Sequence, residues 1–180
     1  MKRILIATTI GLSVLAAGCT SAGTTGTPTP TAGSTAPTSD SNSASGLEAL
    51  AAEPCELLTE AELATVGLKA AGEAAKVGTS QGCDWNESGK GGLRVGIRTD
   101  SGVKDLNTDN GAKSQSKIGK YDVTKVEAPD GAKGACTYFI AVSESSSVSI
   151  IGNIGITSTD TAAACDRASK AAELIAPKLP

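Results

Sequence analysis

CTYFIAV, at residues 136–142, is the stretch that decides the fold, because it is apolar on both of its faces and therefore fits the centre of a sheet. A turn follows at residues 143–147, and a second strand is then marked by Val148, Ile150, Ile154 and Ile156. Gly152 interrupts this second strand and predicts a bulge. Together the two strands predict a hairpin in the middle of an antiparallel sheet.

Three further strands are expected on the N-terminal side of this hairpin, over residues 83–86, 93–98 and 117–126. Residues 93–98 alternate between apolar side chains and polar ones or glycine, which is typical of a half-buried strand. Residues 117–126 alternate less clearly.

Two helices are expected to pack this sheet. Residues 59–62, Thr-Glu-Ala-Glu, match a capping box that begins a helix, and Gly67 ends it. A closing helix is predicted over residues 160–176, with one stripe that faces the sheet: Cys165, Ala168, Ala172 and Ile175. The predicted fold is α+β: an antiparallel sheet of about five strands packed by an N-terminal and a C-terminal helix and braced by two disulfides.

The N-terminus has the layout of a bacterial lipoprotein leader. Residues 1–18 combine a basic start with an apolar stretch too short to be a comfortable membrane span, which predicts a signal peptide. LAAGC, at residues 15–19, resembles a lipobox, so Cys19 is the predicted lipidation site. Residues 19–46 are predicted to be the lipidated cysteine and a disordered tether rich in Thr, Ser, Pro and Gly, and residues 47–180 the globular domain. The predicted location is the extracytoplasmic face of the cell membrane.

The remaining cysteines, Cys55, Cys83, Cys136 and Cys165, are even in number, which favours two disulfides in an exported chain. Three pairings are possible, and the favoured one joins Cys55 to Cys83 and Cys136 to Cys165.

Composition excludes several classes of function. The chain has no histidine, so it has no Ser-His-Asp triad and no His-ligated metal. A net charge of −3 and few aromatic residues give no indication of nucleic-acid binding. GTSQG, at residues 78–82, matches the Gly-x-Ser-x-Gly pattern of hydrolases, but without a histidine it is interpreted as a turn.

Three features have both a functional and a structural interpretation. Asp105, Asn107 and Asp109 resemble the start of a calcium loop, but the residue twelve along is Ser116 and not a glutamate, so a solvated loop is favoured. Trp85 is interpreted as a ring that shields a disulfide rather than as an exposed recognition residue. Arg94 and Arg98 share one strand face, which is either an anion-binding face or a solvated edge, and the edge is favoured.

Four features of the sequence belong together: the motif EPCELLT at residues 53–59, the motif GCDW at residues 82–85, the late cysteine strand and the closing cysteine helix. In this combination they resemble an actinobacterial lipoprotein family, catalogued as domain of unknown function 3558. The sequence departs mildly at Glu53, where the family usually has Asp. The resemblance implies an envelope location and an antiparallel sheet with helices, and it supplies no activity.

These features predict a membrane-anchored, non-catalytic binding module that needs no cofactor and binds an envelope protein, a secreted protein or a small ligand. One alternative is an envelope hydrolase that uses carboxylates alone, such as Asp84 with Glu87 or Asp105 with Asp109. Another is an immunity-type protein that masks a secreted neighbour.

Overall fold

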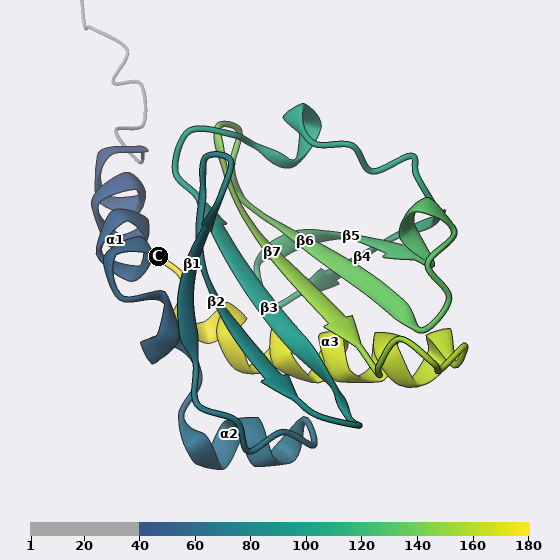
Figure 1. The fold of residues 1–180 in the computed structure, drawn as a ribbon. Helices are drawn as coiled ribbons and strands as arrows, with labels where there is room; N and C mark the ends of the chain where they lie inside the picture. Colours follow the sequence, from purple (N-terminus) through teal and green to yellow (C-terminus); the bar gives the residue numbers. More distant parts are fainter. Residues whose placement is uncertain (1–39) are drawn as a thin grey trace, which may run out of the picture. The chain divides into compact units, whose positions relative to one another are not determined.

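A computed structural model describes residues 40–180 (Figure 1). Its helices are α1 (Asp40–Ala52), α2 (Glu60–Thr65) and α3 (Thr161–Ile175), with 3-10 turns η1 (Pro54–Leu57), η2 (Val103–Asp105), η3 (Pro129–Gly131) and η4 (Ala176–Lys178). The strands are β1 (Glu73–Val77), β2 (Ser80–Glu87), β3 (Gly91–Arg98), β4 (Ala112–Ile118), β5 (Tyr121–Glu127), β6 (Ala135–Ser143) and β7 (Ser146–Asn153). They form one sheet in the order β1-β2-β3-β7-β6-β5-β4, and each neighbouring pair is antiparallel.

The predicted signal peptide, Cys19 and most of the predicted tether lie outside the described residues. Helix α1 begins at Asp40, inside the segment predicted to be tether and ahead of the predicted boundary at residue 47. Its Leu47 is fully buried in the main core, so this helix is part of the folded domain. No helix among residues 40–180 is long and apolar enough to cross a membrane.

The central hairpin is confirmed, because β6 and β7 are interior strands joined by a short turn. The predicted bulge at Gly152 is wrong, since Gly152 pairs in register with Leu93 on one side and Cys136 on the other. A Cβ at this position would lie 2.6 Å from the carbonyl oxygen of Ala164, so the glycine is needed where α3 approaches the sheet closely. Ile156, expected in this strand, lies beyond its end and is fully exposed.

The expected number of strands was too small. The strand predicted over residues 117–126 is two strands, β4 and β5, which pair from Ile118 and Tyr121 outward around a two-residue turn. Gly119 begins that turn with a φ of +58°, which glycine adopts without steric cost. The strand β1 was not predicted, because four of its five residues are exposed on a sheet edge and carry no apolar alternation.

Helix α3 packs across one face of the sheet against β6 and β7 (Figure 1). It begins at Asp160, whose side chain accepts a hydrogen bond from the Ala163 N–H. The predicted stripe is confirmed, since the buried residues of the helix are Ala164, Cys165, Ala168, Ala171, Ala172 and Ile175. Small side chains let the helix come close to the strands.

Both favoured disulfides are confirmed. Cys55 bonds to Cys83 and ties η1 to β2, and Cys136 bonds to Cys165 and ties β6 to α3. Each bridge closes a loop of nearly the same length, with separations of 28 and 29 residues. Such loops stabilise a fold by about 3.5 kcal/mol each on the chain-entropy estimate.

Candidate functional site

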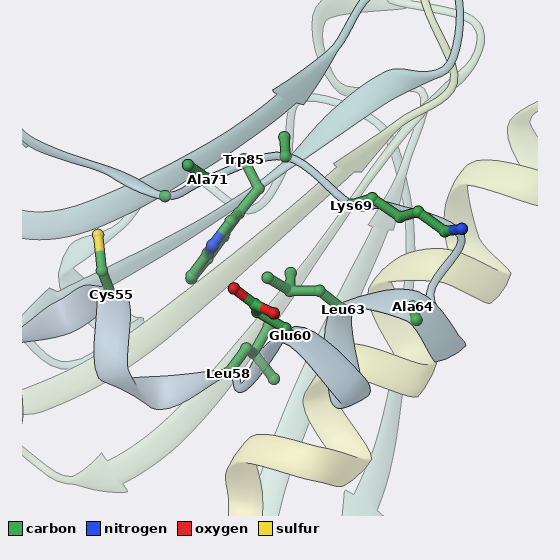
Figure 2. Close-up of a pocket in the computed structure, with 10 residues that line it drawn as sticks. Cys55, Leu58, Glu60, Leu63, Ala64, Lys69, Ala71 and Trp85 are labelled. Carbon is green, nitrogen blue, oxygen red and sulfur yellow. The ribbon is translucent and has the colours of Figure 1, made fainter.

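A cavity of about 540 Å³ lies between η1, α2, the segment 69–72 and strand β2 (Figure 2). Its volume falls within the range of about 300–1,000 Å³ that small-molecule sites occupy. The lining residues are Cys55, Leu58, Glu60, Leu63, Ala64, Lys69, Ala70, Ala71, Gly72 and Trp85. We refer to it below as the Trp85 pocket.

One wall of the pocket is α2, and its position is fixed at the helix N-terminus. The predicted capping box is confirmed: the Thr59 hydroxyl accepts a hydrogen bond from the Glu62 N–H, and the Glu62 carboxylate accepts one from the Thr59 N–H. Lys178, from the C-terminal end of the chain, donates to Glu62 at 2.8 Å and to the Leu57 carbonyl at 2.7 Å. The bond from Lys178, followed by that from the Thr59 N–H, lowers the pKa of Glu62.

The segment that follows α2 forms the opposite wall. Gly67 ends the helix with a φ of +83°, and Leu68 is then fully buried. The backbone N–H of Lys69 donates to the Glu87 carboxylate at 2.9 Å, which holds the segment against the end of β2. The Arg167 guanidinium donates to the Val66 carbonyl at 3.1 Å and so joins the same segment to α3.

Trp85 and a disulfide form the floor of the pocket. The indole is 1 % exposed, and a Cβ on Gly72 would lie 2.7 Å from its Nε1 and 2.6 Å from the Sγ of Cys83. The interpretation of Trp85 as a ring beside a disulfide is therefore confirmed, and the same ring also lines the cavity. Only glycine at position 72 lets the backbone pass so close to both groups.

The polar groups of the pocket side chains are few and lie at its rim. Figure 2 shows the Glu60 carboxylate turned toward the indole and the Lys69 side chain extended away from it. The remaining walls are formed mostly by leucine and alanine side chains. Backbone polar groups and the two charged side chains make the surface of the cavity about as polar as it is apolar, so the cavity fits a small ligand with both apolar and polar groups.

The calcium-loop residues are engaged locally. The Asp105 carboxylate accepts a hydrogen bond from the Gly102 N–H at 2.9 Å, the Asn107 side chain accepts one from the Asp109 N–H at 3.2 Å, and Asp109 pairs with Lys113. Within residues 40–180, no three His, Cys, Asp or Glu side chains are grouped so that they could hold a metal ion.

The Gly-x-Ser-x-Gly stretch forms a hairpin turn and the start of a strand. Gly78 and Thr79 connect β1 to β2, with Gly78 at a φ of +59°, and Ser80 is the first residue of β2. A nucleophile elbow needs a strand before the serine and a helix after it. Here strands lie on both sides, so the elbow geometry is absent from this hairpin.

Three of the four carboxylates proposed for catalysis, Asp84, Glu87 and Asp109, are held in ion pairs, and the fourth, Asp105, accepts a backbone hydrogen bond. Asp84 bonds to Arg94 at 2.5 Å, and Glu87 bonds to Lys90 at 2.5 Å. Asp84 and Glu87 lie three residues apart on one strand, so their side chains point to opposite faces of the sheet. They do not converge on a shared reactant.

The Trp85 pocket itself was not predicted from the sequence. Its walls come from residues scattered between positions 55 and 85, and their proximity depends on the Cys55–Cys83 bond. The one local signal is the run Ala70-Ala71-Gly72, which supplies too little side-chain volume to fill the space beside Trp85.

Comparison with known proteins identifies the family but no activity. No curated protein and no solved structure matches the chain. The sequence profile described as "Protein of unknown function (DUF3558)" matches residues 14–178. This match spans most of the chain and includes all four disulfide cysteines. The chain therefore belongs to the DUF3558 family.

Proposed function

We propose that the chain is a lipoprotein of the extracytoplasmic face, anchored through Cys19, whose domain binds a small ligand with both apolar and polar groups in the Trp85 pocket without chemical conversion. The observation that carries the binding role is the cavity of about 540 Å³ floored by the only tryptophan of the chain. The anchor is supported by the leader and lipobox pattern of residues 1–19.

The walls of the pocket support binding rather than catalysis. Its side-chain lining offers one carboxylate, Glu60, and one ammonium group, Lys69, on a surface otherwise made mainly of apolar side chains. Burial of the apolar part of such a ligand there would remove that part from water, which is favourable by about 25 cal/mol per Å² of apolar surface. The disulfide and the Lys178 contacts hold two walls in place, so little ordering is required on binding.

Trp85 provides a direct measurement of ligand binding, because it is the only tryptophan. The probe is 8-anilinonaphthalene-1-sulfonate, a fluorophore with an apolar ring system and one sulfonate group that accepts excitation energy from a nearby indole. Saturable energy transfer from Trp85 to the probe is expected for the full chain. Transfer should be lost in Ala71→Leu, which adds volume inside the pocket, and kept in the matched control Ala132→Leu at an exposed site away from it.

The binding role is refuted if the wild-type chain shows no saturable transfer, or if Ala71→Leu and Ala132→Leu behave alike while both remain folded by circular dichroism. The anchor is tested separately. Replacement of Cys19 by Ala should move the protein out of the membrane fraction of a bacterial host, and continued membrane retention would contradict lipidation at this residue.

A further inference from the structure

The face of the sheet opposite α3 carries a cluster of polar side chains that the Trp85 pocket does not include. Gly152 faces α3 and pairs with Leu93, so the next residue of β3, Arg94, points to the other face. We call this other face, over strands β2, β3 and β7, the outer face. Its side chains include Ser80, Gly82, Asp84, Arg94, Gly96, Arg98, Ser147 and Ser149.

Two glycines form the floor of this site. Gly82 pairs with Gly96 across β2 and β3, and Gly96 pairs with Ser149 across β3 and β7. A Cβ on Gly82 would lie 3.1 Å from Nη2 of Arg94, so the arginine lies over a position that has no side chain. Both glycines are buried, so the space above them is taken by the longer polar side chains that border the floor.

The two arginines that border the floor differ in their partners. Arg94 is neutralised by Asp84 at 2.5 Å and also donates to the Ala75 carbonyl at 3.2 Å. Arg98 donates to the Ser149 hydroxyl at 3.1 Å and forms no ion pair with any carboxylate of the described residues. The outer face thus has one guanidinium that forms no ion pair with a carboxylate of the described residues.

Ser80 gives a second, independent observation. The register places it beside Arg98, one position beyond the Gln81–Ile97 pair. Ser80 is 1 % exposed, and its hydroxyl has no hydrogen-bond partner. Every other buried side-chain polar atom of the described residues has one. A Cβ on Gly96 would lie 2.4 Å from this oxygen, so the hydroxyl is turned over the glycine floor. A buried hydroxyl without a partner costs about 1–3 kcal/mol, which a bound acceptor would offset.

We propose that Arg98 and Ser80 bind the carboxylate group of a small ligand on the outer face of the sheet. Arg98 supplies one positive charge that is in no ion pair, which matches a monoanion. Its planar fork has further N–H donors that fit the two oxygens of a carboxylate, and Ser80 supplies a hydroxyl donor once it rotates to another staggered position. Glycine at positions 82 and 96 leaves room for these polar groups directly over the strand backbone.

The surroundings of Arg98 agree with this assignment. Burial, followed by the nearby charge of Arg94, lowers the pKa of Arg98, while Asp100 acts in the opposite direction. A bound carboxylate would counter both effects. The outer face is separated from the Trp85 pocket by the sheet, since Trp85 pairs with Leu93 on the α3 side. The proposal is therefore independent of the proposed function.

Acetate and acetamide provide a matched pair of probes, because they have nearly the same shape and differ in charge. In two-dimensional ¹H–¹⁵N spectra of the full chain, acetate should shift the amides of Ser80, Gly96 and Arg98 saturably, and acetamide should not. Arg98→Gln should weaken acetate binding by about tenfold or more, and Ser80→Ala by several-fold. Lys120→Gln, which removes one exposed positive charge elsewhere, should leave binding unchanged.

Two outcomes would overturn the proposal. The first is the absence of saturable shifts at these three amides, or equal shifts with acetate and acetamide. The second is acetate binding in Arg98→Gln that equals binding to the wild type. If Arg98→Gln fails to fold, Arg98→Lys and Ser80→Ala decide the question, because each keeps the local charge and removes the fork or the hydroxyl. Wild-type affinity in both variants would then refute the assignment.

Discussion

Replacement of Gly152 by alanine tests whether close approach of α3 determines the stability of the domain. The added Cβ would lie 2.6 Å from the carbonyl oxygen of Ala164, 3.1 Å from the nitrogen of Ala168 and 3.2 Å from its Cβ. The first of these contacts is shorter than any real Cβ contact and involves helix backbone, which cannot rotate away. Either α3 or β7 must move.

The helix has little freedom to move at this point. Cys136 pairs directly with Gly152 across β6 and β7, and it is bonded to Cys165 of α3. We therefore expect Gly152→Ala to cost about 2–3 kcal/mol, the range of an overpacked core. At about 4 °C per kcal/mol for a domain of this size, the Tm should fall by about 10 °C.

The assay is thermal and urea unfolding followed by circular dichroism. Gly119→Ala is the control, since no atom lies within 4 Å of its Cβ position and the cost, about 1 kcal/mol, comes only from the positive φ. Removal of the disulfide in Cys136→Ala/Cys165→Ala should free the helix. The added cost of Gly152→Ala in that background should then fall by at least about 0.5 kcal/mol, while the added cost of Gly119→Ala should not change. Wild-type stability of Gly152→Ala would refute the close-approach argument.

Three other predictions concern the elements around the Trp85 pocket. Because the pKa of Glu62 is lowered in the folded state, its contribution to stability is complete above its ordinary pKa of 4.5 and is lost as the pH falls through the lowered folded-state value. Glu62→Gln should therefore make the urea midpoint of unfolding less dependent on pH below 4.5. An unchanged pH dependence would contradict this. Loss of the bridge in Cys55→Ala/Cys83→Ala should lower the free energy of unfolding by about 3.5 kcal/mol and weaken fluorophore binding in the pocket, whereas unchanged binding would show that the bridge does not hold the walls. Arg167→Met should lower the free energy of unfolding by about 2 kcal/mol, because the guanidinium donates to the carbonyls of Val66, Lys90 and Asn153. An unchanged free energy in urea unfolding would mean that water replaces these bonds.

The sequence was most informative where the signal was local. The capping box at Thr59, the stripe of α3 and the central hairpin depend on residues close together in the chain, and all three were predicted. The disulfide pairing was also predicted, although sequence alone allowed three pairings.

The failures came from elements whose structure depends on distant neighbours. β4 is an edge strand with six exposed residues of seven, so its pairing with β5 leaves little apolar pattern to read. Gly152 was expected at a bulge because the close approach of α3, which explains the glycine, brings together residues far apart in sequence. Arg94 and Arg98 were expected on a solvated edge, whereas β3 is an interior strand.

A shortage of large side chains has different consequences in different parts of the domain. The chain has only four aromatic residues and 21 glycines. Against α3, glycine and alanine allow the helix and sheet to meet closely, so the two elements pack tightly without large side chains between them. Around Trp85, the small residues Ala70, Ala71 and Gly72 lie in a segment held away from α2, and the space remains unfilled.

Such a cavity would be expected to collapse if its walls could move, because unfilled space forfeits packing contacts. The Cys55–Cys83 bond holds η1 on β2, and Lys178 joins the end of η1 at Leu57 to α2 at Glu62. Together these constraints hold η1 and α2, and neither fills the cavity. The crosslinks of this domain therefore do more than replace a large core: by fixing the walls around undersized side chains, they keep a binding-sized space open beside its only tryptophan.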